Sequence, residues 1–261
     1  MKCVVSLSGG RDSATCLGLA VETFGNKNCY AIGFEYGSKH PQELISAQKI
    51  ADYYGVPFQL ININPSIFNG SSSTLLKGSK DNIELNKSYE EIMKENGEGK
   101  VSTYVPARNT LFSAYVLARA ESLSQEFNDD VTIVLGQHAD DSGFYIDKDG
   151  KEHLDYTKAA YPDCSVEFVE AFSKVALISS VGRVHYWVPF VKMHKWELIK
   201  VGLKLKKPVP YNLCLSCYEP IVHEDGTYEE CGKCATCIDA QKAERLARRS
   251  IEEDEFFHGK R

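Results

Sequence analysis

Hydrophobic and polar positions divide the chain into short apolar runs and longer amphipathic stretches, which alternate from the first residues onward. Short apolar runs bounded by glycine and polar residues are typical of buried strands, and apolar positions three or four apart indicate helices. In the first part of the chain, the pattern predicts strands at 2–7, 28–34 and 58–63 and helices at 13–24 and 41–54. Strands that alternate with helices predict a parallel sheet with right-handed crossovers.

Two polar segments interrupt this pattern. Residues 64–104 contain a serine run and several glycines, and we expect a long loop that closes over a site. Residues 139–160 are rich in Asp, Lys and Gly and predict a second loop or insertion. The other segments predict a helix from Asn109, as its cap, to Glu126, with Leu111, Tyr115, Ala118 and Leu123 facing inward, strands at 131–135 and 184–188, and helices at 164–179, 195–203 and 235–255.

The order of these elements predicts an α/β fold with a doubly wound parallel sheet. The chain has 261 residues, of which 43% are apolar and 25% charged, the balance of an ordinary globular enzyme domain. We expect one large domain over residues 1–205. A small C-terminal region, residues 206–261, would follow it with a cysteine cluster and a closing helix.

Charge and composition limit the classes of function. The formal net charge of −6 argues against a protein that contacts nucleic acid directly, because such proteins usually carry a basic surface. No apolar run approaches the roughly 18 residues of a membrane helix, and the apolar start at residues 3–7 is too short for a signal peptide. We therefore expect a cytoplasmic protein without a membrane partner, in which the nine cysteines are thiols, metal ligands or catalytic groups.

The motif Ser8-Gly9-Gly10-Arg11-Asp12-Ser13 lies between the first predicted strand and helix, where a loop can bind an anion. Glycines let the backbone approach a ligand, the amides at the helix start point outward, and the helix dipole favours negative charge. The Ser8 and Ser13 hydroxyls add hydrogen-bond donors. The motif lacks the terminal Lys-Ser/Thr of Walker A. It resembles the pyrophosphate loop of the N-type ATP pyrophosphatases, which cleave ATP between the α and β phosphates.

Five of the nine cysteines lie within 24 residues near the end of the chain: Cys214, Cys217, Cys231, Cys234 and Cys237. Repeated Cys-x2-Cys pairs in a chain without an export signal indicate a tetrahedral zinc site built from thiolates. An iron–sulfur cluster is compatible with the same spacing. The acidic residues between the pairs argue against a nucleic-acid-binding zinc finger and favour a structural site.

Taken together, the motifs resemble the 7-cyano-7-deazaguanine synthase family over nearly the whole chain. The resemblance rests on residues 7–17, 34–40, Tyr104-Val105-Pro106-Ala107-Arg108-Asn109-Thr110-Leu111-Phe112, Tyr161-Pro162-Asp163-Cys164 with Glu167-Phe168, Ser216-Cys217-Tyr218 and Cys231-Gly232-Lys233-Cys234-x2-Cys237. This chain departs from the family's pattern at residues 147–158, which form a longer segment than usual, and at Leu215 and Pro220. The departures lie on the presumed substrate side.

The resemblance implies an ATP-dependent enzyme that converts 7-carboxy-7-deazaguanine and ammonia to 7-cyano-7-deazaguanine through an adenylated acid and an adenylated amide. ATP with Mg²⁺, structural Zn²⁺ and a homodimer are part of this expectation. Two related functions stay open as alternatives. One is the joining of a deazapurine acid to a different amine, and the other is modification of tRNA by a related pyrophosphatase.

The resemblance also implies roles for individual residues. It places ATP on Leu7, Ser8, Gly9, Gly10, Arg11, Asp12, Ser13 and Leu17, and zinc on Cys217, Cys231, Cys234 and Cys237, with Cys214 outside the set. Arg108 and Lys195 each begin a predicted helix, where a cation opposes the dipole, so we expect both to neutralise phosphate. Asp12 would hold Mg²⁺ or cap its helix.

The remaining candidates concern the second substrate. We expect Tyr161 and Asp163 to bind the deazaguanine, with the Asp163 carboxylate accepting hydrogen bonds from the edge of the base; a turn aspartate beside Pro162 is the alternative. Cys164 is interpreted as a residue for packing or substrate contact, not as a nucleophile. His138, Asp140 and Asp141 follow a predicted strand and would hold Mg²⁺, handle the protons of ammonia, or form a solvated loop.

Overall fold

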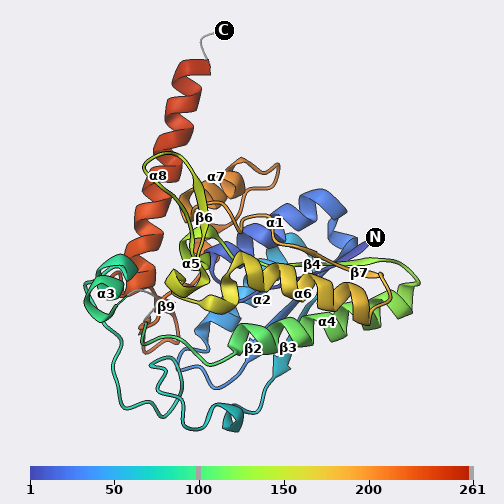
Figure 1. Cartoon of the computed structure of the whole chain (residues 1–261), viewed down its shortest axis with the longest axis horizontal. Helices are drawn as coiled ribbons and strands as arrows, with labels where there is room; N and C mark the ends of the chain where they lie inside the picture. Colours follow the sequence, from blue (N-terminus) through green and yellow to red (C-terminus); the bar gives the residue numbers. More distant parts are fainter. Residues whose placement is uncertain (98–100, 259–261) are drawn as a thin grey trace.

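A five-stranded parallel sheet forms the centre of the computed structural model, which describes residues 1–97 and 101–258 (Figure 1). The strand order is β3 (Phe58–Asn62), β2 (Cys29–Glu35), β1 (Lys2–Ser6), β4 (Val131–Val134) and β7 (Val184–Trp187). All neighbouring strands pair in parallel. The order reverses direction at β1, so the doubly wound sheet predicted from the sequence is confirmed.

Helices cover both faces of this sheet, and two apolar cores result. One face carries α1 (Arg11–Phe24), α2 (Gln42–Tyr54), α7 (Lys195–Lys204) and α8 (Ala235–His258), and the other carries α4 (Arg108–Phe127) and α6 (Val166–Ser179). Along β1, Cys3, Val5 and Leu7 pack into the first core, while Val4 packs into the second. This alternation explains why the central strands read as continuous apolar runs rather than as alternating ones.

The segment 64–104 contains more structure than the predicted loop. It holds the 3₁₀ helix η2 (Pro65–Phe68) and the helix α3 (Tyr89–Asn96). A capping box starts α3, because Glu91 accepts a hydrogen bond from the Ser88 amide at 2.8 Å and the Ser88 hydroxyl accepts one from the Glu91 amide at 3.3 Å. Residues 98–100 of the predicted loop lie outside the described residues.

The second polar segment, 139–160, is also structured. It contains the short helix α5 (Ala139–Ser142) and a hairpin of β5 (Phe144–Ile146) and β6 (Glu152–Leu154), followed by 3₁₀ helices η3 (Tyr156–Lys158) and η4 (Pro162–Cys164). Asp147 closes the hairpin turn by accepting hydrogen bonds from the amides of Asp149 and Lys151, each at 2.9 Å. The strands are three residues long, too short for a periodic signal.

Helix α4 departs from its prediction at its start and along its face. It begins at Arg108 after Ala107, so Asn109 is not its cap. The predicted inward positions Tyr115 and Ala118 are exposed. The buried face consists of Ser113, Val116, Leu117, Ala120, Leu123 and Ser124, because the helix has a different rotation against the sheet from the one expected.

The C-terminal segment returns across the sheet to the loop after β1. It contains η5 (Tyr211–Leu213), the two-stranded ribbon β8 (Ile221–Val222) and β9 (Tyr228–Glu229), and α8, which runs past α3 and α7 in Figure 1. A short 3₁₀ turn, η1 (Asn26–Asn28), links α1 to β2. Residues 259–261 at the end of the predicted region lie outside the described part. Among the described helices, none combines the length and apolar character that crossing a membrane requires.

Candidate functional site

A cavity of about 680 Å³ lies at the carboxyl ends of β1 and β4, where the strand order reverses. Open parallel sheets bind their ligands at this point, because the loops leaving the two central strands separate there. The lining comes from the loop after β1, the first turn of α4, residues 135–141 after β4 and the first turn of α7. Parts of α3, α8 and the segment before Cys217 complete the wall.

The loop after β1 has the shape of an anion site. Gly10 precedes α1 and has no side chain to cap this helix, and of the first-turn amides the Arg11 amide donates to Ser216 Oγ at 3.4 Å. The Ser8 and Ser13 hydroxyls lie 3.0 Å apart, and the Ser8 amide donates to Ser13 Oγ at 3.1 Å. Gly9 has φ of +95°, a conformation that L side chains rarely adopt. Gly9 therefore lets the backbone turn sharply between β1 and α1.

The predicted ATP-binding residues of this loop divide into two groups. Leu7, Ser8, Gly10, Asp12 and Ser13 line the cavity. The other three do not: Gly9 lies against α2, Leu17 is fully buried in the core, and Arg11 turns its guanidinium away toward Glu230 and Glu244. Any contact of Leu17 or of the Arg11 side chain with ATP is therefore indirect in this structure.

Asp12 and Lys195 form the ionic centre of the cavity. Lys195 Nζ lies 2.8 Å from Asp12 Oδ2, which brings the start of α7 to the start of α1. His138 Nε2 lies 3.5 Å from the same oxygen. Burial by itself would raise the pKa of Asp12, but Lys195 and His138 together hold it below its ordinary value. Asp12 Oδ1 is buried and has no hydrogen-bond partner within the described part of the chain.

A second layer of side chains surrounds His138, which is 3% exposed. Its Nε2 lies 3.4 Å from Asp141 Oδ2, and its Nδ1 lies 3.8 Å from Asp140 Oδ2. Burial would lower the pKa of His138, yet Asp141 and Asp12 raise it above its ordinary value. Asp140 accepts hydrogen bonds from the Lys195 amide at 2.8 Å and pairs with His194 Nδ1 at 2.6 Å. It therefore fixes the start of α7.

Arg108 faces the cavity from the first position of α4. Its guanidinium lies 5.9 Å from the ring centroids of both Tyr36 and Phe112, and Nη1 lies 3.5 Å from the Tyr36 hydroxyl. Among the described residues, no carboxylate lies within ion-pair distance of it. A cation held by aromatic rings at a helix start, without a counter-ion, is suited to bind an anionic ligand.

Tyr161 lies in a buried cluster of hydroxyl groups at the other end of the cavity. Its hydroxyl is 2.7 Å from Thr103 Oγ1, 3.0 Å from the Tyr89 hydroxyl and 3.4 Å from the Tyr218 hydroxyl. These residues come from four separate segments of the chain, including α3. The hydroxyls can exchange donor and acceptor roles, which suits a substrate with both kinds of polar edge.

Asp163, unlike Tyr161, is not part of the cavity lining. Its carboxylate accepts hydrogen bonds from the Asn109 amide at 3.1 Å and from Asn109 Nδ2 at 3.2 Å. It thus anchors the first turn of α4 and, through it, Arg108. The Cys164 thiol is buried and accepts a hydrogen bond from Asn109 at 3.1 Å, and burial raises its pKa well above the ordinary value. A protonated thiol agrees with a packing role.

Sequence reasoning missed Glu43, Tyr89 and Tyr218 as individual site residues. Glu43 lines the cavity from the first turn of α2, and burial raises its pKa to about 7. Tyr218 belongs to a motif already noted for its cysteine. Tyr89 had no signal of its own, because only the fold brings α3 to the cavity.

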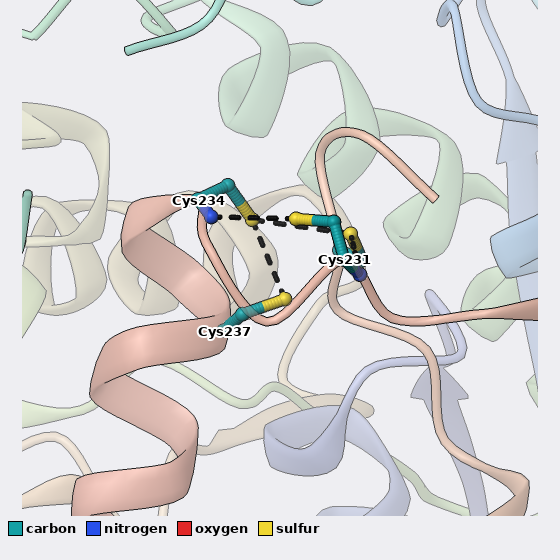
Figure 2. A group of neighbouring side chains, drawn as sticks. Cys231, Cys234 and Cys237 are labelled. Carbon is teal, nitrogen blue, oxygen red and sulfur yellow. Dashed lines mark hydrogen bonds between the residues drawn. The ribbon is translucent and has the colours of Figure 1, made fainter. Parts of the chain in front are cut away.

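The four predicted metal ligands meet in one cluster. The Sγ atoms of Cys217, Cys231, Cys234 and Cys237 all lie within 4.8 Å of one another. Figure 2 shows three of them pointing toward one another, with Cys237 on the first turn of α8. Zn–S bonds of about 2.3 Å in a tetrahedron require sulfur separations of about 3.8 Å. The sulfur of Cys234 lies 3.4 Å from that of Cys237 and 3.9 Å from that of Cys217.

Backbone amides surround these sulfurs. The amides of Glu219 and Cys231 donate to Cys217 Sγ at 3.3 and 3.2 Å, and those of Lys233 and Cys234 donate to Cys231 Sγ, each at 3.3 Å. Such contacts stabilise thiolates and orient them toward a metal. The donor set therefore fits a tetrahedral metal. Cys214 lies outside the group, buried in the first core, where burial raises the pKa of its thiol to about 12.

Comparison with known proteins decides between the enzymes that share such a loop. Residues 2–158 and 150–247 match the family model described as queuosine biosynthesis protein QueC. The chain belongs to the QueC family. The two matched ranges meet at the hairpin of β5 and β6, where the sequence predicts an unusually long segment.

Relatives of this QueC-family chain carry one shared description, 7-cyano-7-deazaguanine synthase. The protein from Leptospira biflexa is 34% identical over 247 residues, covering 90% of this chain and 86% of the relative. The protein from Legionella pneumophila (strain Paris) is 36% identical over 242 residues, covering 90% and 89%.

Solved structures show more distant likenesses. The chain is similar to the U34-tRNA thiolase NcsA from Methanococcus maripaludis, with its [4Fe-4S] cluster, at 17% identity and a TM-score of 0.42, covering 99% of this chain and 68% of the other. It is also similar to NMN synthetase from Francisella tularensis, at 17% identity and a TM-score of 0.41, covering 83% and 65%.

Proposed function

We propose that this QueC-family protein converts 7-carboxy-7-deazaguanine and ammonia to 7-cyano-7-deazaguanine at the expense of ATP. Family membership supports the substrate, and one feature of the structure carries the chemistry. The uncapped helix start after Gly10 and the cations Arg108 and Lys195 face the same cavity, although they come from three separate helices. Such a set of amides and cations is suited to hold a polyphosphate.

Activation is needed because a carboxylate does not react with ammonia in water. The carboxylate oxygen of the substrate attacks the α-phosphate of ATP, and pyrophosphate leaves. Ammonia then adds to the acyl carbon and AMP departs, which gives the amide. The amide oxygen attacks the α-phosphate of a second ATP, with loss of pyrophosphate and of one N–H proton. Loss of AMP and of the second N–H proton from this adenylated amide forms the C≡N bond.

The chain's own residues contribute positioning and charge to these steps. The loop amides and the Ser8 and Ser13 hydroxyls would hold the departing pyrophosphate, and Arg108 and Lys195 would neutralise its charge. Asp12 Oδ1, buried without a partner, is an oxygen donor suited to Mg²⁺ that accompanies ATP. His138, held between Asp12 and Asp141, is the group placed to accept a proton from ammonium.

Buried polar groups would recognise the base of the substrate by hydrogen bonds. Tyr161 and Asp163 are the residues proposed for this, and Asp163 would act through Asn109, whose first-turn position it fixes. Glu43 adds a carboxyl group inside the cavity that has no hydrogen bond to any described residue. A carboxylate can accept two parallel hydrogen bonds from the N1–H and 2-amino edge of a guanine-like base.

The cysteine cluster would hold one structural Zn²⁺ through Cys217, Cys231, Cys234 and Cys237. When bound, the ion cross-links the thiolates and supplies no chemistry to the reaction. We propose that residues 206–261 act as the zinc-binding region of a pyrophosphatase domain formed by residues 1–205. Free thiolates and ATP favour the cytoplasm, where thiols stay reduced.

We also propose a homodimer. Helix α6 is apolar on most of its circumference but buries only Val166 and Ala176. Val175 and Ile178 near its end are 49% and 80% exposed, and Val181, just after the helix, is 89% exposed. An apolar surface of this kind suggests association, and a second copy with the same face is the simplest partner. The proposed partners of the monomer are otherwise small molecules, without direct contact to nucleic acid.

The reaction is tested by incubating the metal-loaded protein with Mg·ATP, ammonium and 7-carboxy-7-deazaguanine, followed by mass spectrometry. We expect the nitrile, with AMP and pyrophosphate as the nucleotide products. Arg108→Met removes the unpaired cation and is expected to abolish AMP formation. Arg119→Met, on the same helix and away from the cavity, serves as the matched control.

Other outcomes would contradict the proposal in different ways. AMP formation with an amide or a conjugate of larger mass would preserve the activation step but refute ammonia as the acceptor. ADP as the product, or no nucleotide turnover in the metal-loaded protein, would refute adenylation altogether.

A further inference from the structure

Arg11 is a charged residue of the loop after β1 that the proposed ATP chemistry does not use. It is the first residue of α1, where a cation opposes the helix dipole. A cation at this position of a phosphate-binding loop would be expected to face the ligand. Its side chain is instead 8% exposed and points out of the cavity, toward the segment that carries the cysteine cluster.

The guanidinium is held by two carboxylates. Nη1 and Nη2 contact the two oxygens of Glu230 at 2.7 and 3.0 Å, and Nε contacts Glu244. The side chains of Glu230 and Glu244 are 20% and 24% exposed, so the charges of this triad are largely removed from water. A bidentate pair fixes both distance and orientation, unlike an exposed ion pair.

Both glutamates that hold Arg11 lie close in sequence to residues of the cysteine cluster. Glu230 directly precedes Cys231, and Glu244 lies about two turns after Cys237 on α8. Ser216, which precedes Cys217, donates its amide to Glu230 at 3.1 Å, and its hydroxyl accepts a hydrogen bond from the Arg11 amide at 3.4 Å.

The backbone adds a further link between the two sites. The amide of Leu215 donates to the Gly9 carbonyl at 2.9 Å, so the approach to Cys217 pairs with the loop itself. A Cβ on Gly10 would lie 3.1 Å from Ser216 Oγ and 3.9 Å from the carbonyl oxygen of Leu215, so the segment before Cys217 packs directly against the loop. The loop after β1 is therefore in direct contact with the segment that leads into the cysteine cluster.

We propose that Arg11 is a positioning residue that couples metal binding at the cysteine cluster to ATP binding at the loop. The ribbon between Cys217 and Cys231 has little core of its own, since Ile221 and Val222 are 46% and 54% exposed. The metal orders the ribbon, the ordered ribbon holds Glu230 against Arg11, and Arg11 holds the first turn of α1. The coupling rests on the proposed function, because it assumes that this loop binds ATP.

Coupling between two binding sites is reciprocal. If metal strengthens ATP binding, ATP must strengthen metal binding by the same factor. The test therefore measures both directions, with zinc as the metal and the non-hydrolysable analogue Mg·AMPCPP as the nucleotide. Calorimetry gives the dissociation constant of the nucleotide, and equilibrium competition with a chelating dye gives the dissociation constant of zinc, with and without AMPCPP.

For the wild type, we expect AMPCPP to lower the dissociation constant of zinc about tenfold, within the usual range of coupling between sites. Arg11→Met keeps most of the side-chain volume and removes the ion pairs. It is expected to bind one zinc with a dissociation constant that AMPCPP does not change, and to bind AMPCPP about tenfold more weakly. In turnover, the KM for ATP rises while the KM for ammonium stays the same.

Two further variants complete the design. Arg249→Met removes an exposed arginine paired with Glu253 on the same helix α8, and it should behave as the wild type. Glu230→Gln keeps the shape of the pair and removes its charge. It is expected to reproduce the effects of Arg11→Met, and it decides the question where the methionine variant does not fold.

The results separate the coupling from the proposed function. Variants that bind AMPCPP like the wild type and keep its effect on the zinc dissociation constant would overturn the coupling, and ATP chemistry would stand. A metal-loaded wild type that does not bind AMPCPP would overturn both. Loss of active protein without a change in the KM for ATP would reduce Arg11 to a purely structural role and would also refute the coupling.

Discussion

Replacing Gly9 by alanine tests how closely the loop after β1 is packed against α2. Gly9 has φ of +95°, and a Cβ built on it would lie 2.0 Å from the carbonyl oxygen of Glu43 and 3.0 Å from the amide nitrogen of Ala47. Real Cβ atoms essentially never approach other heavy atoms within 3.0 Å. The loop and the first turn of α2 must therefore separate by about 1 Å, the difference between these distances. Neither contact is with a flexible side chain.

The cost has two parts. The positive φ of an alanine costs about 1–2 kcal/mol, and the forced separation of packed backbone costs about 1–3 kcal/mol more. Gly78 provides a matched control, because it has φ of +91° and a Cβ on it would meet nothing within 4 Å. Gly78→Ala should therefore lose only the strain, about 1–2 kcal/mol. Gly9→Ala should lose about 2–5 kcal/mol in total.

The two variants are compared by urea unfolding and by titration with Mg·AMPCPP. A displacement of about 1 Å in a positioning group can cost about 100-fold, and we expect Gly9→Ala to weaken nucleotide binding by that order. Gly78→Ala should bind the nucleotide like the wild type. Equal unfolding free energies and equal nucleotide affinities for the two variants would refute the close packing of loop and helix.

Three further predictions follow from the site. Cys217→Ser should lose the bound metal when measured by elemental analysis, whereas Cys214→Ser should keep it; metal loss in both would contradict the assignment. Lys195→Met should lose stability relative to the wild type above about pH 4, since Lys195 lowers the pKa of Asp12 from 3.8, and the difference should shrink as pH falls; a difference independent of pH would refute the pairing. Because burial raises the pKa of Glu43 from 4.5 to about 7, the wild type should lose unfolding free energy relative to Glu43→Gln as pH rises between these values; parallel pH profiles would place Glu43 in water.

Secondary structure was predictable where burial in the core leaves a clear apolar pattern in the sequence. The five strands of the central sheet were expected within one residue at each end, because both faces of a parallel strand are buried and the run is apolar. Helix α3 and the hairpin of β5 and β6 were missed. Both are short and polar, and local contacts stabilise them: a capping box at Ser88 and a turn closed by Asp147.

The rotation of α4 shows a second limit. Tyr115 and Ala118 lie at helical spacing from Leu111 and read as inward positions, but the structure buries the neighbouring stripe through Val116 and Ala120. The two stripes are both partly apolar. The choice between them depends on which stripe meets the sheet, and that depends on the angle at which α4 leaves the preceding loop, where Ala107 has φ of +50°.

The sequence by itself determined the features that need only neighbours along the chain. A loop that binds anions requires a strand, glycines and a helix start in succession, and Cys231, Cys234 and Cys237 follow one another at intervals of three residues, so both motifs are visible in a linear reading. The tertiary structure alone decided which way each side chain of these motifs faces. Arg11 turns from the expected phosphate to Glu230, and Glu43 and Tyr89 enter the cavity, because ion pairs and burial join segments far apart in sequence.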